Sequence, residues 1–183
     1  MFDKQYRFKG RHASRVNALR NVFEAKKKTA LFPRNIDVYV SAPLIGFLFQ
    51  RRAEQDNTKD PSTNQIYDEN IFVDRVIDSK DDLMFDYQLI MLLDKEYEPD
   101  EDKRIDKAFR YAGKDPADLE RFESYVRGGV DVLYEKLVEG DPFVGDGRDP
   151  ESYINRVYFF MKDRLEEYKR KGVKSEEVMK LCK

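Results

Sequence analysis

The chain contains one cysteine, one histidine and no tryptophan in 183 residues. The single cysteine, Cys182, cannot form an intramolecular disulfide, and one cysteine with one histidine cannot supply the four ligands of a zinc site. No apolar run approaches the roughly 18 residues that cross a bilayer, and the N-terminal residues lack the apolar segment of a secretory signal. We therefore expect a soluble protein in a reducing, cytoplasmic compartment, with no membrane partner.

The sequence also lacks the motifs of common cofactor and metal sites. Gly128-Gly129 has neither the glycine spacing nor the following Lys-Ser/Thr of a phosphate loop. The acidic run 94–102 lacks the Asp-x-Asp-x-Asp-Gly order of a calcium loop and is expected to be a solvated turn. His12 lies in a polar, basic stretch without a catalytic motif, and we expect it on the surface. No cofactor, no metal ion and no catalytic residue is expected.

Charge is abundant and unevenly distributed. Charged residues make up 38% of the chain and hydrophobic residues 40%, as in a folded domain with a heavily solvated surface. Residues 1–34 contain ten Lys/Arg against two Asp/Glu, whereas residues 54–102 contain four Lys/Arg against sixteen Asp/Glu. Such blocks indicate either a surface for a charged partner or charges that meet within the fold or between subunits.

The hydrophobic pattern predicts an all-α fold, a compact bundle of about five helices with at most a short strand near residues 71–77. Apolar residues recur every three or four positions over 13–28, 36–53, 81–93, 116–140 and from 150 onward, and a further helix is expected within 101–112. We assign residues 1–140 to a helical core domain with a basic N-terminal helix. Residues 141–183 are expected to add a C-terminal helix and a basic tail packed on that domain.

Two of these segments have unusual compositions. Residues 36–53 are apolar on nearly every side, which predicts a helix buried centrally or shared with another subunit, and Pro43 is expected to kink or split it. The helix that begins at Asp115-Pro116 contains Gly128-Gly129 in its middle. Each glycine costs about 1 kcal/mol relative to alanine there, so we expect a close backbone approach to a neighbour.

The basic block predicts a phosphate-binding surface. Its cations lie along the first helix and in the turn before the second helix, where unpaired helix N–H groups add to the positive potential. We expect the sugar-phosphate backbone of a nucleic acid to contact Arg11, Arg15, Arg20, Lys26, Lys27, Lys28 and Arg34.

Three stretches in order resemble the small E-type protein (DndE) of bacterial DNA phosphorothioation systems. "TALFPRNI" after the basic helix is similar to that family's Thr-Gly-Leu-Thr-Pro-Asn turn. Residues 82–93 resemble its acidic-aromatic start followed by an aliphatic helix, and Val126-Arg127-Gly128-Gly129-Val130 resembles the Asn-Arg-Gly-Val core of its closing helix. The chain differs in having Ala30 and Phe32 in the turn, a longer acidic middle and an extra helix after residue 140.

The resemblance implies an oligomeric, all-helical protein that binds DNA, in particular nicked duplex, through Lys26, Lys27, Lys28 and Arg34. Our leading hypothesis is therefore a non-catalytic DNA-binding accessory protein of a DNA modification or anti-phage defence system, acting with other proteins of that system. The alternative is a protein-binding scaffold or oligomerisation subunit in which the two charge blocks pair across subunits. A third hypothesis is a Mg²⁺-dependent nuclease, because Asp68, Asp74 and Asp78-Ser79-Lys80 follow the order acid, acid, Asp-x-Lys.

Overall fold

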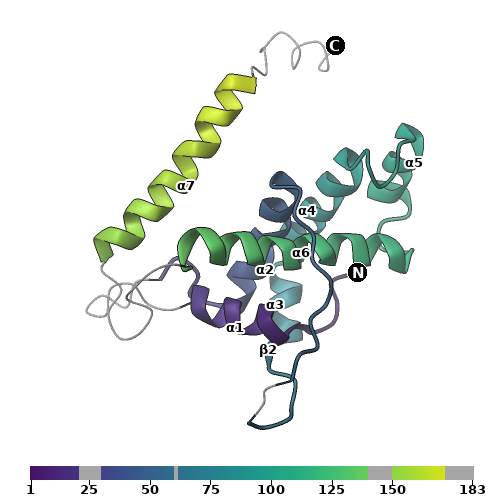
Figure 1. Ribbon diagram of the computed structural model, residues 1–183. Coiled ribbons are helices and arrows are strands. Elements are labelled where there is room, and N and C mark those ends of the chain that lie inside the picture. The colour runs from purple at the N-terminus through teal and green to yellow at the C-terminus, as the bar shows by residue number, and fades with distance from the viewer. Residues whose placement is uncertain (21–29, 60–61, 140–149, 172–183) are drawn as a thin grey trace.

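The computed structural model describes residues 1–20, 30–59, 62–139 and 150–171, and it is mostly helical (Figure 1). The predicted all-α class is confirmed, with one short two-stranded sheet beside the helices. In chain order the elements are β1 (Tyr6–Lys9), α1 (Gly10–Leu19), α2 (Asn35–Leu48), β2 (Asp68–Ile71), α3 (Val73–Asp78), α4 (Lys80–Leu93), α5 (Glu101–Ile105), the π-helical turn η1 (Asp106–Arg110), α6 (Pro116–Leu137) and α7 (Pro150–Lys171).

The centre of the fold is the packing of α2 against α6, which crosses the middle of the molecule in Figure 1. Gly46 and Gly129 lie at this contact, and Gly128 faces the carbonyl oxygen of Arg51 just after α2. A Cβ atom at Gly46 would lie 2.0 Å from the carbonyl oxygen of Tyr125, and one at Gly129 would lie 1.8 Å from that of Ala42. The expected close backbone approach at the paired glycines is confirmed, and α2 remains one continuous helix through Pro43.

The starts of these two helices have identifiable causes. Asp115 accepts a hydrogen bond from the backbone N–H of Ala117 at 2.9 Å, and Pro116 is the first residue of α6, as predicted. For α2 the capping residue is Arg34. The N–H of Arg34 donates to the Asp37 carboxylate at 2.8 Å, and the N–H of Asp37 donates to the Arg34 carbonyl oxygen.

The prediction of at most a short strand near residues 71–77 is confirmed by β2, although the bounds of the strand differ from the predicted ones. The strand β2 ends at Ile71, and residues 73–78 form α3 instead. The partner of β2 is β1, which lies about sixty residues earlier in the chain, with Tyr6 opposite Ile71 and Lys9 opposite Asp68 in an antiparallel register. This pairing brings the basic N-terminal block alongside the acidic middle of the chain.

The remaining helices cover the central pair. The core is formed by buried apolar side chains from both strands, from α1, α2, α3, α4 and α6 and from η1, with the aromatic rings of Phe8, Tyr87, Phe122 and Tyr125 among the largest. α7 contributes Val157 and Phe160, which are partly buried against this core. Among the described residues no helix is both long enough and apolar enough to cross a membrane.

Candidate functional site

The described residues of the predicted phosphate-binding surface lie on α1 and next to the ends of α1 and α2. Arg11 and Arg15 lie on α1, Arg20 follows its last residue, and Arg34 precedes the first residue of α2. Lys26, Lys27 and Lys28 lie outside the described residues. The structure therefore places four of the seven predicted contacts, and each of these four arginines faces a carboxylate of the same chain.

Arg11, His12 and Arg15 converge on one buried carboxylate, that of Asp131 on α6. The Asp131 side chain is 3% exposed. Arg15 Nη1 lies 2.5 Å from Oδ1, His12 Nε2 lies 3.3 Å from Oδ1, and Arg11 Nη2 lies 3.5 Å from Oδ2. The charge on this part of α1 thus fixes the helix to α6, because a buried carboxylate requires compensating cations.

The partners of Asp131 also set its ionisation. Burial by itself favours the neutral acid, but the hydrogen bonds and charges of His12 and Arg15 outweigh it, and the pKa of Asp131 lies below its ordinary value. Asp131 is therefore an anion at neutral pH. A nucleic-acid phosphate approaching Arg15 would have to compete with this carboxylate.

His12 is buried, with 1% of its surface exposed, so the expectation that it lies on the surface is wrong. The sequence contained a signal for this position. His12, Val16 and Leu19 follow each other at four- and three-residue steps, so they share one face of α1, and all three are buried. The lone histidine is part of the helix interface, where it faces Asp131.

The two charge blocks also meet at the sheet. Arg7 on β1 pairs with Asp68 on β2 at 3.2 Å, and Arg20 lies 3.8 Å from Glu69. Arg34 pairs with Asp37 at 2.6 Å but remains 60% exposed. Within the described residues the acidic middle of the chain therefore neutralises part of the basic block, as the alternative interpretation of the charge pattern requires.

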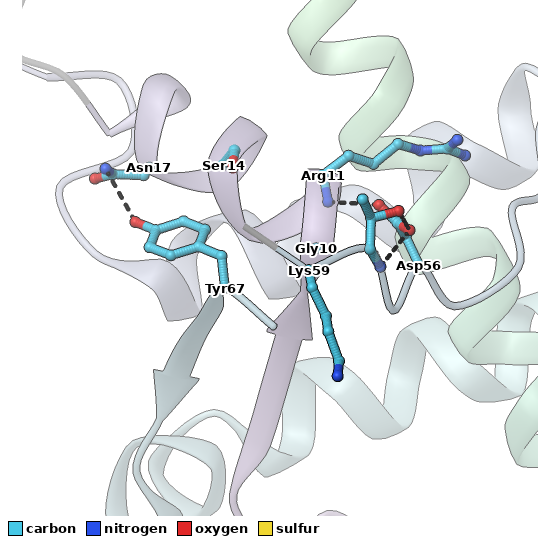
Figure 2. A pocket seen from close by; sticks show the side chains of 8 residues that line it. Gly10, Arg11, Ser14, Asn17, Asp56, Lys59 and Tyr67 are labelled. Atoms are coloured by element: carbon cyan, nitrogen blue, oxygen red, sulfur yellow. Dashed lines mark hydrogen bonds between the residues drawn. The ribbon is translucent and has the colours of Figure 1, made fainter. Parts of the chain in front are cut away.

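A shallow pocket of about 670 Å³ runs along the exposed side of α1, between this helix and the loop that precedes β2 (Figure 2). Asp56 lies where the pocket meets the start of α1. Its carboxylate accepts hydrogen bonds from the backbone N–H of Arg11 at 2.7 Å and from the hydroxyl of Thr58 at 2.5 Å. The bond from the Thr58 side chain is the main reason that the pKa of Asp56 falls to about 2. The N–H group that could bind a phosphate is thus already bound to a carboxylate.

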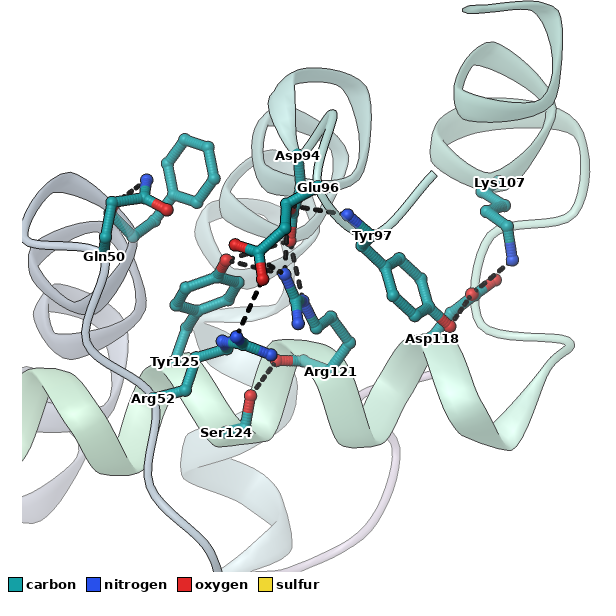
Figure 3. Close-up of polar contacts among 11 residues, drawn as sticks. Gln50, Arg52, Asp94, Glu96, Tyr97, Lys107, Asp118, Arg121, Ser124 and Tyr125 are labelled. Carbon is teal, nitrogen blue, oxygen red and sulfur yellow. Dashed lines mark hydrogen bonds and ion pairs between the residues drawn. The ribbon is translucent and has the colours of Figure 1, made fainter. Parts of the chain in front are cut away.

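A second polar cluster joins the end of α4 to α6 (Figure 3). The Asp94 side chain is 2% exposed and lies 2.7 Å from Arg121 Nε, and it accepts a hydrogen bond from the Tyr125 hydroxyl at 2.9 Å. Nearby, Asp118 accepts hydrogen bonds from the Tyr97 hydroxyl at 2.8 Å and from Lys107 at 2.6 Å. Burial, followed by the bond to Asp118, raises the pKa of Tyr97 well above its ordinary value.

This cluster corrects the expectation that residues 94–102 form only a solvated acidic turn, since Asp94 is a buried anchor for α6. Each of its carboxylates is bonded to a cation and to a tyrosine hydroxyl. The bonds from Tyr97, Arg121 and Tyr125 go to both oxygens of Asp94, so this carboxylate connects the end of α4 to α6.

The nuclease hypothesis requires its acidic residues and lysine to lie on a β-hairpin, and the structure does not place them on one. Asp68 lies on β2, Asp74 and Asp78 lie on α3, and Lys80 is the first residue of α4. Among the residues that the structure describes, no group of three or more His, Cys, Asp or Glu side chains is placed to hold a metal ion. Neither the backbone nor the described side chains therefore favours metal-dependent cleavage.

The feature that sequence reasoning missed is on α7. This helix extends away from the other helices beyond the end of α6 (Figure 1). Ile154, Tyr158 and Met161, here called the α7 stripe, are 55%, 56% and 63% exposed, and Phe159 beside them is 55% exposed. Their spacing of four and three residues was visible in the sequence, but it predicted a face buried against the core. The structure instead turns Val157 and Phe160 to the core and leaves the α7 stripe in solvent.

Comparison of the chain with protein-family models, with curated proteins and with solved structures gave no match. The resemblance to the phosphorothioation E-type family therefore stays a hypothesis that depends on the three motifs alone.

Proposed function

We propose that this protein is a self-associating scaffold subunit whose α7 helix binds another protein surface. The observation that supports this proposal is the α7 stripe, three large apolar side chains more than half exposed on one face of one helix. Contiguous exposed apolar residues on a soluble protein are typical of interaction sites. A helix that extends from its domain also gains little stability from its own sequence, because isolated helices are marginal in water.

The energetics favour a reversible association. Burying the exposed parts of these three side chains on each of two copies is worth on the order of 5–10 kcal/mol. Association costs about 4–15 kcal/mol in lost translational and rotational freedom. The balance corresponds to a weak complex, and we expect a dissociation constant in the micromolar range or above unless polar contacts add to it.

The test is the oligomeric state as a function of protein concentration, measured by light scattering or sedimentation equilibrium from about 5 to 500 µM, a range chosen around the expected affinity. Met161→Lys should weaken association at least about tenfold, because it places a charge in the apolar contact. Asp163→Asn is the matched control: it also adds one unit of positive charge to α7, at an exposed position 180° from Ile154 around the helix. A monomer at all concentrations, or equal effects of the two variants, would contradict the proposal.

The second candidate is the DNA-binding accessory function, with a DNA modification or anti-phage system as its setting. It is favoured by the excess of eight positive charges in residues 1–34, in particular the three consecutive lysines at positions 26–28. Arg15 and Arg20 are 23% and 34% exposed and face carboxylates, so this proposal assigns the contacts to these lysines and to Arg11 and Arg34, which are 54% and 60% exposed. Self-association and DNA binding are compatible, because the α7 stripe and the basic residues lie on different elements.

A further inference from the structure

The helix α4 has an exposed side that combines apolar and acidic residues. Phe85 and Leu93 are 60% and 48% exposed, and Leu89 between them is partly exposed. The four-residue steps that separate these three residues place them on one side of the helix. Asp81 and Asp82, both exposed, precede them on the same side in the first turn of α4. These five residues are here called the α4 face.

Asp86 is the exception among the buried aspartates that the structure describes. Asp94, Asp118 and Asp131 each have a lysine or arginine nitrogen within reach, at 2.7, 2.6 and 2.5 Å. Asp86 is equally buried, but its Oδ2 atom has no hydrogen-bond partner, and the only charge that acts on it is the like charge of Asp82. A buried carboxyl group of this kind is stabilised by a cation that the described part of the chain does not supply.

Asp86 belongs to the same side of the helix as the α4 face. It follows Asp82 by four residues and precedes Leu89 by three, so the three side chains lie along one line. Acidic residues in the first turn also interact favourably with the dipole of their own helix, and this role explains Asp81 and Asp82. The dipole effect does not extend to Asp86 beyond the first turn, and it does not explain why Phe85 is exposed.

We propose that the α4 face binds a cationic amphipathic helix of another protein. The apolar side of the partner helix covers Phe85, Leu89 and Leu93, and a lysine or arginine beside it pairs with Asp82. The charges of the face specify this partner, because Asp81 and Asp82 form no ion pair with the described residues and an acidic partner helix would add to their repulsion. The inference goes beyond the proposed self-association, since it concerns a different helix and a different partner.

The length of the α4 face determines the probe. Residues 81–93 rise about 18 Å along the helix axis, so a synthetic peptide of about sixteen residues covers them. Its leucines recur at steps of three and four residues, and lysines flank the leucines on both sides. A second peptide has the same leucines, with glutamate in place of every lysine. Fluorescence anisotropy of each labelled peptide, titrated with the full chain, measures binding.

The lysine peptide should bind in the micromolar range, and the glutamate peptide at least about tenfold more weakly. Asp82→Lys should weaken binding of the lysine peptide at least about tenfold, because like charges then face each other. Glu54→Lys, at an exposed position in the loop after α2, is the matched control with the same change of charge. Raising NaCl from about 50 to about 300 mM should weaken binding of the lysine peptide several-fold.

The apolar part of the contact has its own pair of variants. Phe85→Ser should weaken binding of the lysine peptide at least about fivefold, because the partner no longer buries the ring. Met161→Ser removes a similarly exposed side chain from the α7 stripe and should leave the affinity unchanged. Circular dichroism checks that each variant is folded, as expected for exposed positions.

Three results would overturn the proposal. The first is a lysine peptide that does not bind, or that binds no more tightly than the glutamate peptide. The second is an equal loss of affinity in Asp82→Lys and Glu54→Lys, which assigns the attraction to net charge. The third is a loss of self-association in Phe85→Ser, measured by light scattering, which shows that a second copy of the chain covers the α4 face. In that last case the proposed self-association stands and only the cationic partner fails.

Discussion

Gly129 on α6 lies directly against the backbone of Ala42 on α2: a Cβ atom added to Gly129 would lie 1.8 Å from the Ala42 carbonyl oxygen. The same contact includes Gly46, whose added Cβ would lie 2.0 Å from the carbonyl oxygen of Tyr125. The obstacles are backbone atoms rather than the ends of flexible side chains. The distance between the two central helices is therefore set by the absence of side chains at these positions.

Gly129→Ala should destabilise the protein by roughly 2–4 kcal/mol, because the helices must separate to admit the methyl group. This loss exceeds the approximately 1 kcal/mol that alanine gains over glycine in helix propensity. Urea unfolding followed by circular dichroism measures the difference. Lys136→Ala, an exposed position on the same helix, should stay within about 0.5 kcal/mol of the wild type. Unchanged stability of Gly129→Ala would contradict the close helix contact.

Asp131→Asn should lower the free energy of unfolding by about 3–5 kcal/mol at pH 7, because it leaves the cations of α1 without their buried anion. The folded-state pKa of Asp131 lies below its ordinary value of 3.8. Its stabilising effect is therefore present above about pH 4 and is lost as the pH falls further. The difference in the free energy of unfolding between Asp131→Asn and the wild type should therefore become smaller below about pH 4.

The control for this variant is Asp74→Asn on α3, where the side chain is 67% exposed and pairs loosely with Arg75 at 3.8 Å. An exposed pair of this kind contributes little, so we expect a change below about 0.5 kcal/mol. If the two substitutions have equal effects, Asp131 does not anchor α1.

The contribution of Asp86 on α4 to the stability of the protein should fall as the pH rises, the opposite of what is expected for Asp131. The residue is 4% exposed, and its Oδ2 atom has no hydrogen-bond partner among the described residues. Burial, followed by the charge of Asp82, raises the pKa of Asp86 to about 7. The folded state therefore binds a proton that the unfolded state releases near pH 4, and stability contributed by the neutral acid is lost as the pH rises through about 7.

Asp86→Asn keeps the shape of the neutral acid and should be more stable than the wild type by about 2–4 kcal/mol at pH 8, with a smaller difference at pH 5. Chemical unfolding at a series of pH values measures the slope, that is, how the free energy of unfolding of each protein changes with pH. Asp81→Asn removes an exposed carboxylate from the same helix and should leave the slope unchanged. If Asp86→Asn instead destabilises the protein at pH 8, the carboxylate has a partner that stabilises its charged form.

Local signals predicted local structure well. Asp115-Pro116 predicted the start of α6, and the cost of Gly128-Gly129 in a helix predicted a close backbone approach to a neighbour, which the structure identifies as α2 and the residues that follow it. The pairing of β1 with β2 could not be predicted from the sequence. Both are four-residue strands about sixty residues apart, and the partner of a short strand is set by tertiary packing. The burial of His12 could have been predicted from its spacing to Val16 and Leu19.

The candidate site was harder to predict, because a sequence shows which residues are charged but not whether their side chains face solvent or another charged residue. The excess of positive charge in residues 1–34 is evident from the sequence, but whether Arg15 faces solvent or Asp131 depends on where α6 lies. On α7 the apolar spacing was visible in the sequence. Periodicity alone, however, cannot distinguish a helix face that packs on the core of its own chain from a helix face that remains exposed. That distinction required the exposure of Tyr158 and Met161 in the folded chain.

DNA binding by the basic block can be tested separately from self-association. Simultaneous reversal of Lys26, Lys27 and Lys28 to Glu should weaken binding to a nicked or intact duplex. It should also reduce the slope of log affinity against log salt by up to about 2.7, because each neutralised phosphate contributes about 0.9. The measurement is a gel-shift or fluorescence-anisotropy titration at several salt concentrations.

The matched control for the DNA measurement makes the same change of six charge units at three exposed lysines outside the block, Lys80, Lys95 and Lys103. If both triple variants lose affinity equally, the effect is one of net charge and the lysines at 26–28 have no special role. If the wild-type chain binds no duplex at low salt, DNA binding fails altogether. In that case the pairing of Arg15 with Asp131 and of Arg20 with Glu69 is the reason that the described arginines are unavailable to phosphate, and the scaffold function alone remains.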